Sequence, residues 1–192
     1  LKNFWQQTQS IQYQTQINTW KAQGPDQYSL ETTTTIQGIQ KAADRDMKLT
    51  STVRSRITMA NQTLTSQEIL GEQTLLTTGI KPPVVQVDLP EQVNIGQTFN
   101  FDAVVKDPLG NSLLLGSAVE EPITPEQYLQ RKEVILEPLS SGGLFKVGQA
   151  PKQPTRKWIS AILIQEGGMT IVSQRLNVVQ SGAPTPKTTK PQ

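Results

Sequence analysis

The chain has 192 residues, of which 35% are apolar and only 5% aromatic, and its formal net charge is +2. This length suits one large β domain or two smaller ones, with a core built mainly from Val, Ile and Leu. Cysteine and histidine are absent, which excludes disulfides, thiolate metal sites and the commonest general base, and the charge is too dispersed for a nucleic-acid binder.

The first half predicts a short helix followed by long strands. Residues 1–9 suit a helix with Phe4 and Trp5 on one side. Three segments, 11–19, 28–37 and 47–59, then alternate polar and apolar residues with a period of two, which is typical of half-buried strands. Residues 62–78 supply a fourth strand. Long consecutive strands of this kind predict a curved antiparallel meander with one wet face and one dry face.

The dry face of this meander defines a candidate apolar groove. Its predicted lining residues are Trp5, Tyr13, Ile17, Leu30, Ile36, Leu49, Val53 and Ile57. Half of the ten aromatic residues lie within the first 28 residues, and two interpretations remain open for them. They form the packed core of a small sheet, or they line a groove or partner surface. On the wet face, Lys48, Arg54 and Arg56 favour a solvated surface over a phosphate or anionic-lipid site.

Lys81-Pro82-Pro83 predicts a boundary, because prolines disfavour both helix and strand pairing. Beyond it, turn signals separate short predicted strands, with Trp158 expected as an anchor of the core. These strands cover residues 84–89, 98–106, 112–119, 132–137, 158–165 and 169–179. Residues 124–129 suit a helix of one or two turns. The pattern predicts an immunoglobulin-like β-sandwich.

The expected organisation is therefore all-β and mainly antiparallel, with one or two short helices. A helix plus meander occupies residues 1–80, an immunoglobulin-like sandwich residues 83–180, and a Pro- and Thr-rich disordered tail residues 181–192. Packing of the first sheet against the sandwich as one unit is the alternative.

Two resemblances bear on the cellular setting. The segments Asp107–Gly116 (DPLGNSLLLG) and Leu139–Pro151 (LSSGGLFKVGQAP) resemble those of uncharacterised exported proteins of cyanobacteria, over residues 83–180. The order of elements in residues 1–78 is similar to the opening of the lipoprotein-carrier half-barrels, which implies an apolar concave face around an acyl chain. The resemblances imply an exported protein of the periplasm, thylakoid lumen or cell envelope.

The chain begins at Leu1 rather than Met, so we expect a signal peptide or lipid anchor to lie upstream if there is one. Its longest apolar runs, such as residues 159–164, are far shorter than the roughly 20 residues of a membrane-spanning helix. We therefore expect no membrane span within the chain.

The residues that carry chemistry form no catalytic pattern. No Ser-x-x-Lys, phosphate-binding loop or dinucleotide-binding glycine motif occurs. Glu120 and Glu121 are adjacent and would point to opposite faces of a strand. Asp88, Asp102 and Asp107 are candidates for a Ca²⁺ site only if the sandwich gathers them at one end. We therefore expect no enzyme activity, no cofactor and no metal.

Two binding functions follow. The first is a protein-interaction or scaffold module that uses the loop over residues 138–154, with a protein as partner and without nucleic acid. Its expected contact residues are Leu139, Ser140, Gly142, Gly143, Leu144, Phe145 and Lys146. A turn is the expected role of Gly142-Gly143, rather than an anion site. The second is a carrier of lipid or another apolar ligand in the groove of the first half.

Overall fold

The computed structural model describes residues 8–41, 46–107, 110, 112–124 and 133–180. The described residues form strands and connections without any helix, and the sheets are almost wholly antiparallel, which confirms the all-β class. The predicted helices at 1–9 and 124–129 lie mostly outside the described residues, although Thr8 and Gln9 already belong to the first strand. No helix capable of crossing a membrane occurs in the described part of the chain.

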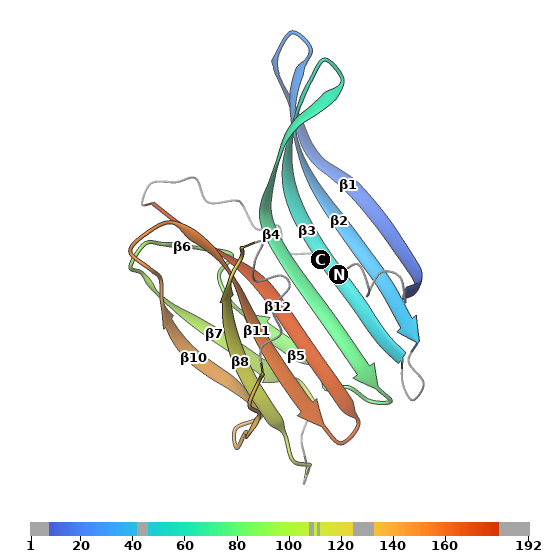
Figure 1. Ribbon diagram of the computed structural model, residues 1–192, viewed down its shortest axis with the longest axis vertical. Coiled ribbons are helices and arrows are strands. Elements are labelled where there is room, and N and C mark those ends of the chain that lie inside the picture. The colour runs from blue at the N-terminus through green and yellow to red at the C-terminus, as the bar shows by residue number, and fades with distance from the viewer. Residues whose placement is uncertain (1–7, 42–45, 108–109, 111, 125–132, 181–192) are drawn as a thin grey trace.

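Four long strands build the N-terminal half (Figure 1). They are β1 (Thr8–Gly24), β2 (Gln27–Lys41), β3 (Asp46–Ala60) and β4 (Thr63–Gly79). Each pairs antiparallel with the next one in sequence. Asn61 and Gln62 join β3 to β4 with φ angles of 49° and 62°. Positive φ at both positions is the geometry of a tight two-residue hairpin turn whose twist matches that of the strands.

Eight shorter strands follow. They are β5 (Val85–Asp88), β6 (Gln92–Asn94), β7 (Thr98–Val105), β8 (Leu115–Pro122), β9 (Glu137–Pro138), β10 (Gly143–Gln149), β11 (Thr155–Gln165) and β12 (Gly168–Val179). Two sheets result. Sheet A has the order β1-β2-β3-β4-β12-β11-β8-β9, with β6 added in parallel to β12, and sheet B has the order β10-β7-β5.

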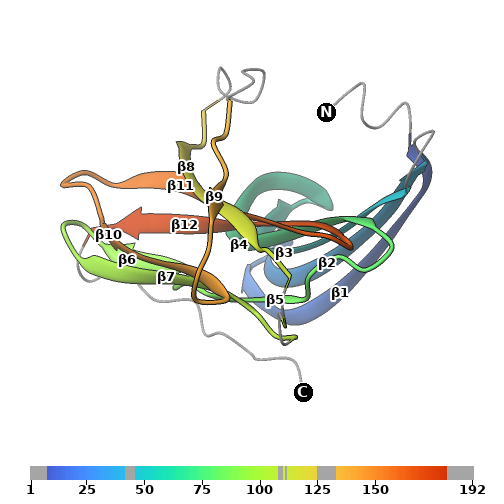
Figure 2. The same ribbon diagram turned by 90° about the horizontal axis from the view of Figure 1, so that it is seen from below.

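Sheet B packs on one face of the C-terminal part of sheet A and forms a two-layer sandwich (Figure 2). The core of this sandwich contains Phe99 and Phe101 from β7, Ala161 and Leu163 from β11, and Leu176 from β12. All members of the buried cluster lie between residues 89 and 178. In the N-terminal half, Leu70 is the only buried hydrophobic residue among the described positions. Within the described residues, hydrophobic stabilisation is therefore concentrated in the sandwich.

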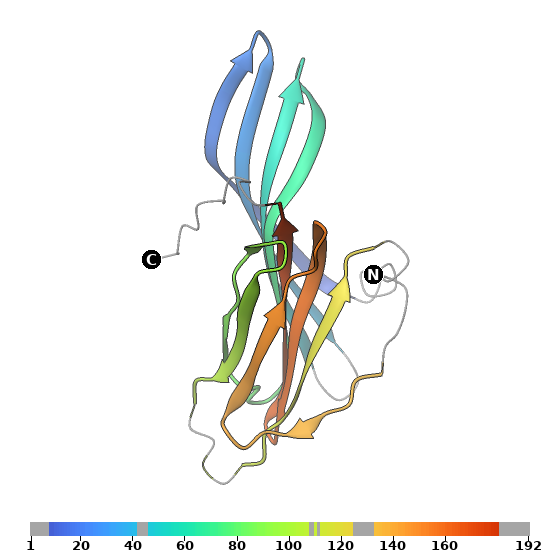
Figure 3. The same ribbon diagram turned by 90° about the vertical axis from the view of Figure 1, so that its left-hand side faces the viewer.

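The two halves share a sheet. β4 pairs with β12 from Gly79 opposite Gly168 to Gln73 opposite Gln174, so the meander continues the sandwich sheet as a single layer. The hairpins β1–β2 and β3–β4 extend past the end of the sandwich (Figure 3). The strands on either side of the predicted boundary are thus joined by backbone hydrogen bonds as well as by the chain.

Buried polar side chains of β12 hold the two segments that flank β5, one before it and one after it, where the chain crosses between sheets A and B. The Thr170 hydroxyl donates to the carbonyl of Pro83 at 2.6 Å, and the Gln174 amide donates to the carbonyl of Leu89 at 2.8 Å. Both segments contain proline, which lacks an N–H donor, and their carbonyls still need partners when they are buried. Thr170 and Gln174 each satisfy one of these carbonyls.

The structure corrects several details of the sequence prediction. Trp158 is not a core anchor: its neighbours Ile159, Ala161 and Leu163 alternate into the core, so Trp158 lies on the opposite face of β11. Residues 133–136 form no strand. β6 was not predicted, and neither was β10, which replaces most of the expected loop.

Candidate functional site

The apolar residues of the meander gather on one face of sheet A. Cross-strand registers place Tyr13 opposite Ile36, Ile17 opposite Thr32, Leu30 opposite Ile57, and Thr34 opposite Val53. Residues directly opposite one another share a face. Seven of the eight predicted groove residues therefore lie on the same face, namely Tyr13, Ile17, Leu30, Ile36, Leu49, Val53 and Ile57. Trp5 lies outside the described residues.

We call this side of β1–β3 the uncharged face. Among the described side chains of these three strands, it carries no Asp, Glu, Lys or Arg. Its remaining positions are mostly hydroxyl residues, which bond to one another: Thr15 to Thr34 at 2.9 Å, and Ser51 to Thr74 of β4 at 2.8 Å. This is the side turned away from sheet B, because the registers continue it to the outer face of β12.

Large side chains of β1 on the uncharged face are open to solvent, whereas the predicted groove residues of β2 and β3 are half-buried. The exposed fractions of Tyr13, Ile17 and Trp20 are 62%, 57% and 65%. The Trp20 and Tyr28 rings contact each other with centroids 5.9 Å apart. The packed-core interpretation is therefore wrong for the three aromatic residues that the structure describes.

Trp20 also lies on the uncharged face, although the sequence does not predict it as a groove residue. The reason is a β-bulge in β1, which interrupts the alternation of residues between the two faces. In β1 the register shifts between Ile17 and Thr19. The residues of β1 that lie on the uncharged face therefore have odd numbers before the shift and even numbers after it, and Trp20 lies on the same face as Ile17. Asn18 occupies the bulge and donates to the Thr33 hydroxyl at 2.8 Å. Strict alternation of residues between the two faces would place Trp20 on the charged face. The sequence around Asn18 contains no motif that identifies the bulge in advance.

The opposite face carries the charges, and its arginines are neutralised. Arg56 bonds to Glu31 at 2.9 Å and to Glu68 at 3.1 Å, and Arg54 pairs with Glu91. Lys48 is exposed. With both arginines already matched to carboxylates, this face is not a bare cationic strip of the kind that attracts phosphate or an anionic membrane.

The segment over 138–154 is mainly an edge strand rather than a loop. Leu139 and Leu144 pack at the sandwich core, and Ser140 is exposed. Gly142 has a φ of 71°, as a turn requires, and Gly143 lies so close to β7 that a Cβ atom would come within 2.7 Å of the Ala103 carbonyl. Among the described strands, β10 pairs only with β7.

β10 displays two large apolar side chains on the outer face of sheet B. Phe145 and Val147 have exposed fractions of 54% and 75%. Lys146, which points to the other side, helps to line an opening of about 240 Å³ between the two sheets, above Phe99 and Ile159. The sequence-predicted contact residues are thus split between the core, a turn and two sides of one strand.

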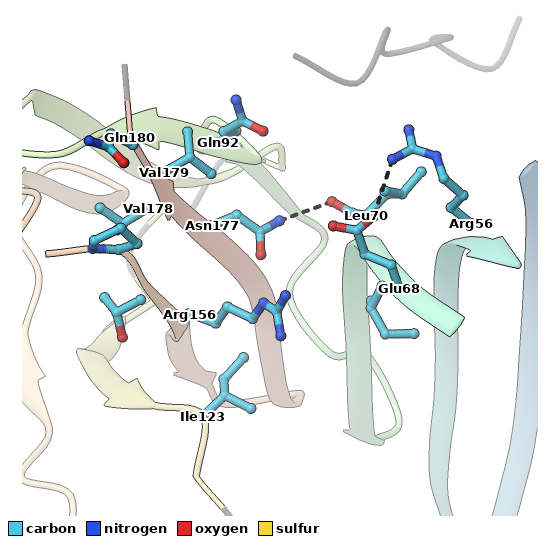
Figure 4. A pocket seen from close by; sticks show the side chains of 13 residues that line it. Arg56, Glu68, Leu70, Gln92, Ile123, Arg156, Asn177, Val178, Val179 and Gln180 are labelled. Atoms are coloured by element: carbon cyan, nitrogen blue, oxygen red, sulfur yellow. Dashed lines mark hydrogen bonds and ion pairs between the residues drawn. The ribbon is translucent and has the colours of Figure 1, made fainter. Parts of the chain in front are cut away.

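A polar cleft of about 550 Å³ lies where β4 leaves β12 (Figure 4). There, β6 takes over the edge of β12. The Asn177 backbone N–H donates to the backbone carbonyl of Glu91 at 2.9 Å, and its side-chain amide donates to the Leu70 carbonyl at 3.0 Å. Arg156 lies across from Glu68 and Arg56 in this cleft. The cleft follows from the divergence of two strands, and its polar groups serve mainly to hold them.

The carboxylates form no metal site within the described residues. Asp88 lies directly opposite Asp102 in the β5–β7 pair, and no group of three or more potential ligands gathers in the part of the chain that the structure describes. Glu120 faces Ile159 and Glu121 faces Trp158 in the register of β8 with β11, so the two point to opposite faces as expected.

These features define an all-β protein in which a two-layer sandwich continues into a single-layer sheet with an uncharged face. The chain belongs to the family described as "Domain of unknown function (DUF8623)", which matches residues 80–179, more than half of its length. The match begins at the Pro-rich boundary and contains β5 to β12, so the meander lies outside it. Comparisons with curated proteins and with solved structures gave no match.

Proposed function

We propose that this chain is a non-enzymatic binding protein that takes up an apolar ligand of the lipid class on the uncharged face. The observation that carries the proposal is the separation of charge on β1–β3. Four of the five exposed large apolar side chains of these strands lie on the side where the strands carry no ionised group, and Ile39 is the exception. The nearest charges on that side, Glu72 of β4 and Arg175 of β12, are paired with each other. Large exposed apolar patches mark sites of interaction with a ligand, a membrane or another protein.

The hydroxyl groups of this face favour an apolar ligand further. Thr15 and Thr34 bond to each other, as do Ser51 and Thr74. Because each hydroxyl already has a partner, covering them with hydrocarbon leaves fewer polar groups unsatisfied than covering isolated hydroxyls would. Strands of this length also give the face a long dimension of roughly 50 Å, which suits elongated chains better than compact metabolites.

The test compares matched charges on the two faces of the same strands. Ile36→Glu and Val53→Glu place a carboxylate on the uncharged face, and Thr35→Glu and Thr52→Glu place one on the opposite face, one residue away. The probes are N-phenyl-1-naphthylamine, followed by fluorescence, and palmitoyl lysophosphatidylcholine, followed by native mass spectrometry. We expect affinity to fall at least about tenfold for the first pair, because an ion would be buried under hydrocarbon, and to stay within about twofold for the second. Equal effects of both pairs, or no binding by the parent chain, would contradict the proposal.

A protein-interaction function through β10 is the second candidate, and the exposure of Phe145 and Val147 on an edge strand favours it. An extended partner segment could add to this edge through backbone hydrogen bonds. Phe145→Lys with Val147→Lys should abolish capture of such a partner and leave lipid binding intact. If these two substitutions instead abolish binding of the lipid probes, the uncharged face is not the lipid site.

A further inference from the structure

β1 forms one end of sheet A and offers an unusually bare edge. Its only partner among the described strands is β2. The edge strands at the other sheet ends are short or carry charge: β9 has two residues, β5 has four and ends in Asp88, and β10 contains Lys146. β1 has 17 residues. A long strand with an unpaired row of backbone groups is a template for pairing with another chain.

The devices that usually protect an edge are missing from the first half of β1. The segment Ser10–Ile17 (SIQYQTQI) contains no charged residue, no proline and no glycine, and its register with β2 is unbroken. The bulge at Asn18 and the charge of Lys21 come only after it. Eight uncharged residues in unbroken register therefore lie along an edge with which no other described strand pairs.

This segment is self-complementary in one antiparallel register. If Gln14 lies opposite Gln14 of a second copy, then Ile11 meets Ile17, Tyr13 meets Thr15, and Gln12 meets Gln16. Every pair joins residues of the same face, as a two-fold axis perpendicular to a continuous sheet requires. Apolar and hydroxyl side chains then meet on the uncharged face, and amide meets amide on the other face, where the two groups can bond to each other.

We infer that two copies of this chain pair antiparallel along β1, centred on Gln14, and join their sheets A into one. The pairing would cover part of Tyr13 and Ile17, which are 62% and 57% exposed in the single chain, and would merge the two uncharged faces into one continuous surface. The inference rests on the edge and not on any ligand, so it stands or falls separately from the proposed function.

Sedimentation equilibrium of the full chain tests the pairing over about 1–200 µM. We expect the mass to rise toward twice 21.2 kDa with concentration. Gln12→Lys with Gln16→Lys brings like charges together twice across the axis, and should weaken the dimer at least about tenfold. Gln12→Lys with Gln16→Glu pairs opposite charges in the same two places and should restore dimerisation. A control, Gln37→Lys with Thr52→Lys, puts two charges on the same face of inner strands and should leave the dimer unchanged.

A cysteine variant tests the register without adding charge. The chain has no cysteine, so Gln14→Cys can form a disulfide only between copies, and the two-fold register places the two sulfurs opposite each other. Rapid cross-linking of Gln14→Cys under mild oxidation, with slow cross-linking of Gln37→Cys, is the expected result. A parent chain that stays monomeric throughout the range overturns the inference. So does a failure of Gln12→Lys/Gln16→Glu to recover the dimer lost in Gln12→Lys/Gln16→Lys, or equal cross-linking of the two cysteine variants.

Discussion

Arg175 is the only charged residue in the buried class among the described positions, and it lies on the outer face of β12. Its guanidinium donates to Glu72 at 2.9 Å and lies 5.1 Å from the centroid of the Trp158 ring. Only 8% of its side chain and 21% of that of Glu72 is exposed. The pair fixes β4 to β12 at the point where their backbone pairing stops.

Removing one member of this pair should cost more than removing both. Glu72→Leu leaves the guanidinium buried without its counter-ion, and we expect a loss of about 3 kcal/mol in the free energy of unfolding. Glu72→Leu combined with Arg175→Met should recover most of that loss, since apolar side chains of similar volume often replace a buried ion pair without net cost. Urea denaturation measures both. A double variant no more stable than Glu72→Leu alone would show that Arg175 contributes through the Trp158 contact instead.

The position of Gly168, at the start of β12, requires glycine because of both its backbone conformation and the atoms around it. Its φ is 152°, and a Cβ atom there would lie 2.2 Å from the Thr78 carbonyl oxygen of the paired strand. Gly168→Ala should therefore destabilise the fold by about 3 kcal/mol or more, because the two strands would have to separate. Gly24→Ala is the matched control: nothing lies within 4 Å of that position, and its stability should change by less than about 0.5 kcal/mol. Thermal unfolding of the two variants distinguishes backbone crowding from a general effect of alanine.

At the scale of elements, the turn of the β3–β4 hairpin contains a residue in an unfavourable backbone conformation, which lowers the free energy of unfolding. Gln62 adopts a φ of 62°, which side chains with a Cβ atom disfavour. Gln62→Gly should raise the free energy of unfolding by about 0.5–1 kcal/mol, since the position is exposed and glycine suits the second position of this turn. Gln67→Gly, within the exposed part of β4, should have the opposite sign. A lower melting temperature for Gln62→Gly would contradict this explanation of the turn.

The faces of β1–β3 were predictable from the sequence because strand alternation is a local property. A period of two over ten or more residues assigns each side chain to a face without knowledge of the partner strand. Tyr13, Leu30 and Val53 lie together for that reason. The bulge at Asn18 breaks the rule, and Trp20 was misplaced accordingly.

The pairing of β4 with β12 could not be read from local pattern. The partners Gln73 and Gln174 are about a hundred positions apart in the chain, and nothing around either one specifies the other. Trp158 was misassigned for a related reason: both faces of β11 are apolar, with Ile162 on one side and Leu163 on the other. Alternation of polar and apolar residues then does not indicate which face of β11 packs against sheet B.

At the scale of the whole molecule, stability should fall steadily from the sandwich to β1. In the part of the chain that the structure describes, the buried cluster lies entirely within residues 89–178, and strands β1–β4 form a single layer joined mainly by hydrogen bonds. Local opening requires little loss of apolar burial at β1 and β2, more at β4, and most at β11 and β12. The stability of each strand in the β1–β4 sheet therefore depends on the neighbouring strand that lies closer to the sandwich.

Amide hydrogen exchange measures this gradient directly. At about 1 µM, where pairing along β1 is weakest, we expect the amides of β1 and β2 to exchange at least about a hundredfold faster than those of β11 and β12, with β3 and β4 between them. A graded pattern follows because each strand of a single layer is protected by its neighbour on the inner side, whereas a separately folded meander would open as one unit with a single exchange rate. Raising the concentration to about 200 µM should then slow exchange in β1 first, because the edge that opens most easily is the one that a second copy would cover. If exchange in β1 does not respond to concentration while the sedimentation mass doubles, the copies meet elsewhere on the molecule.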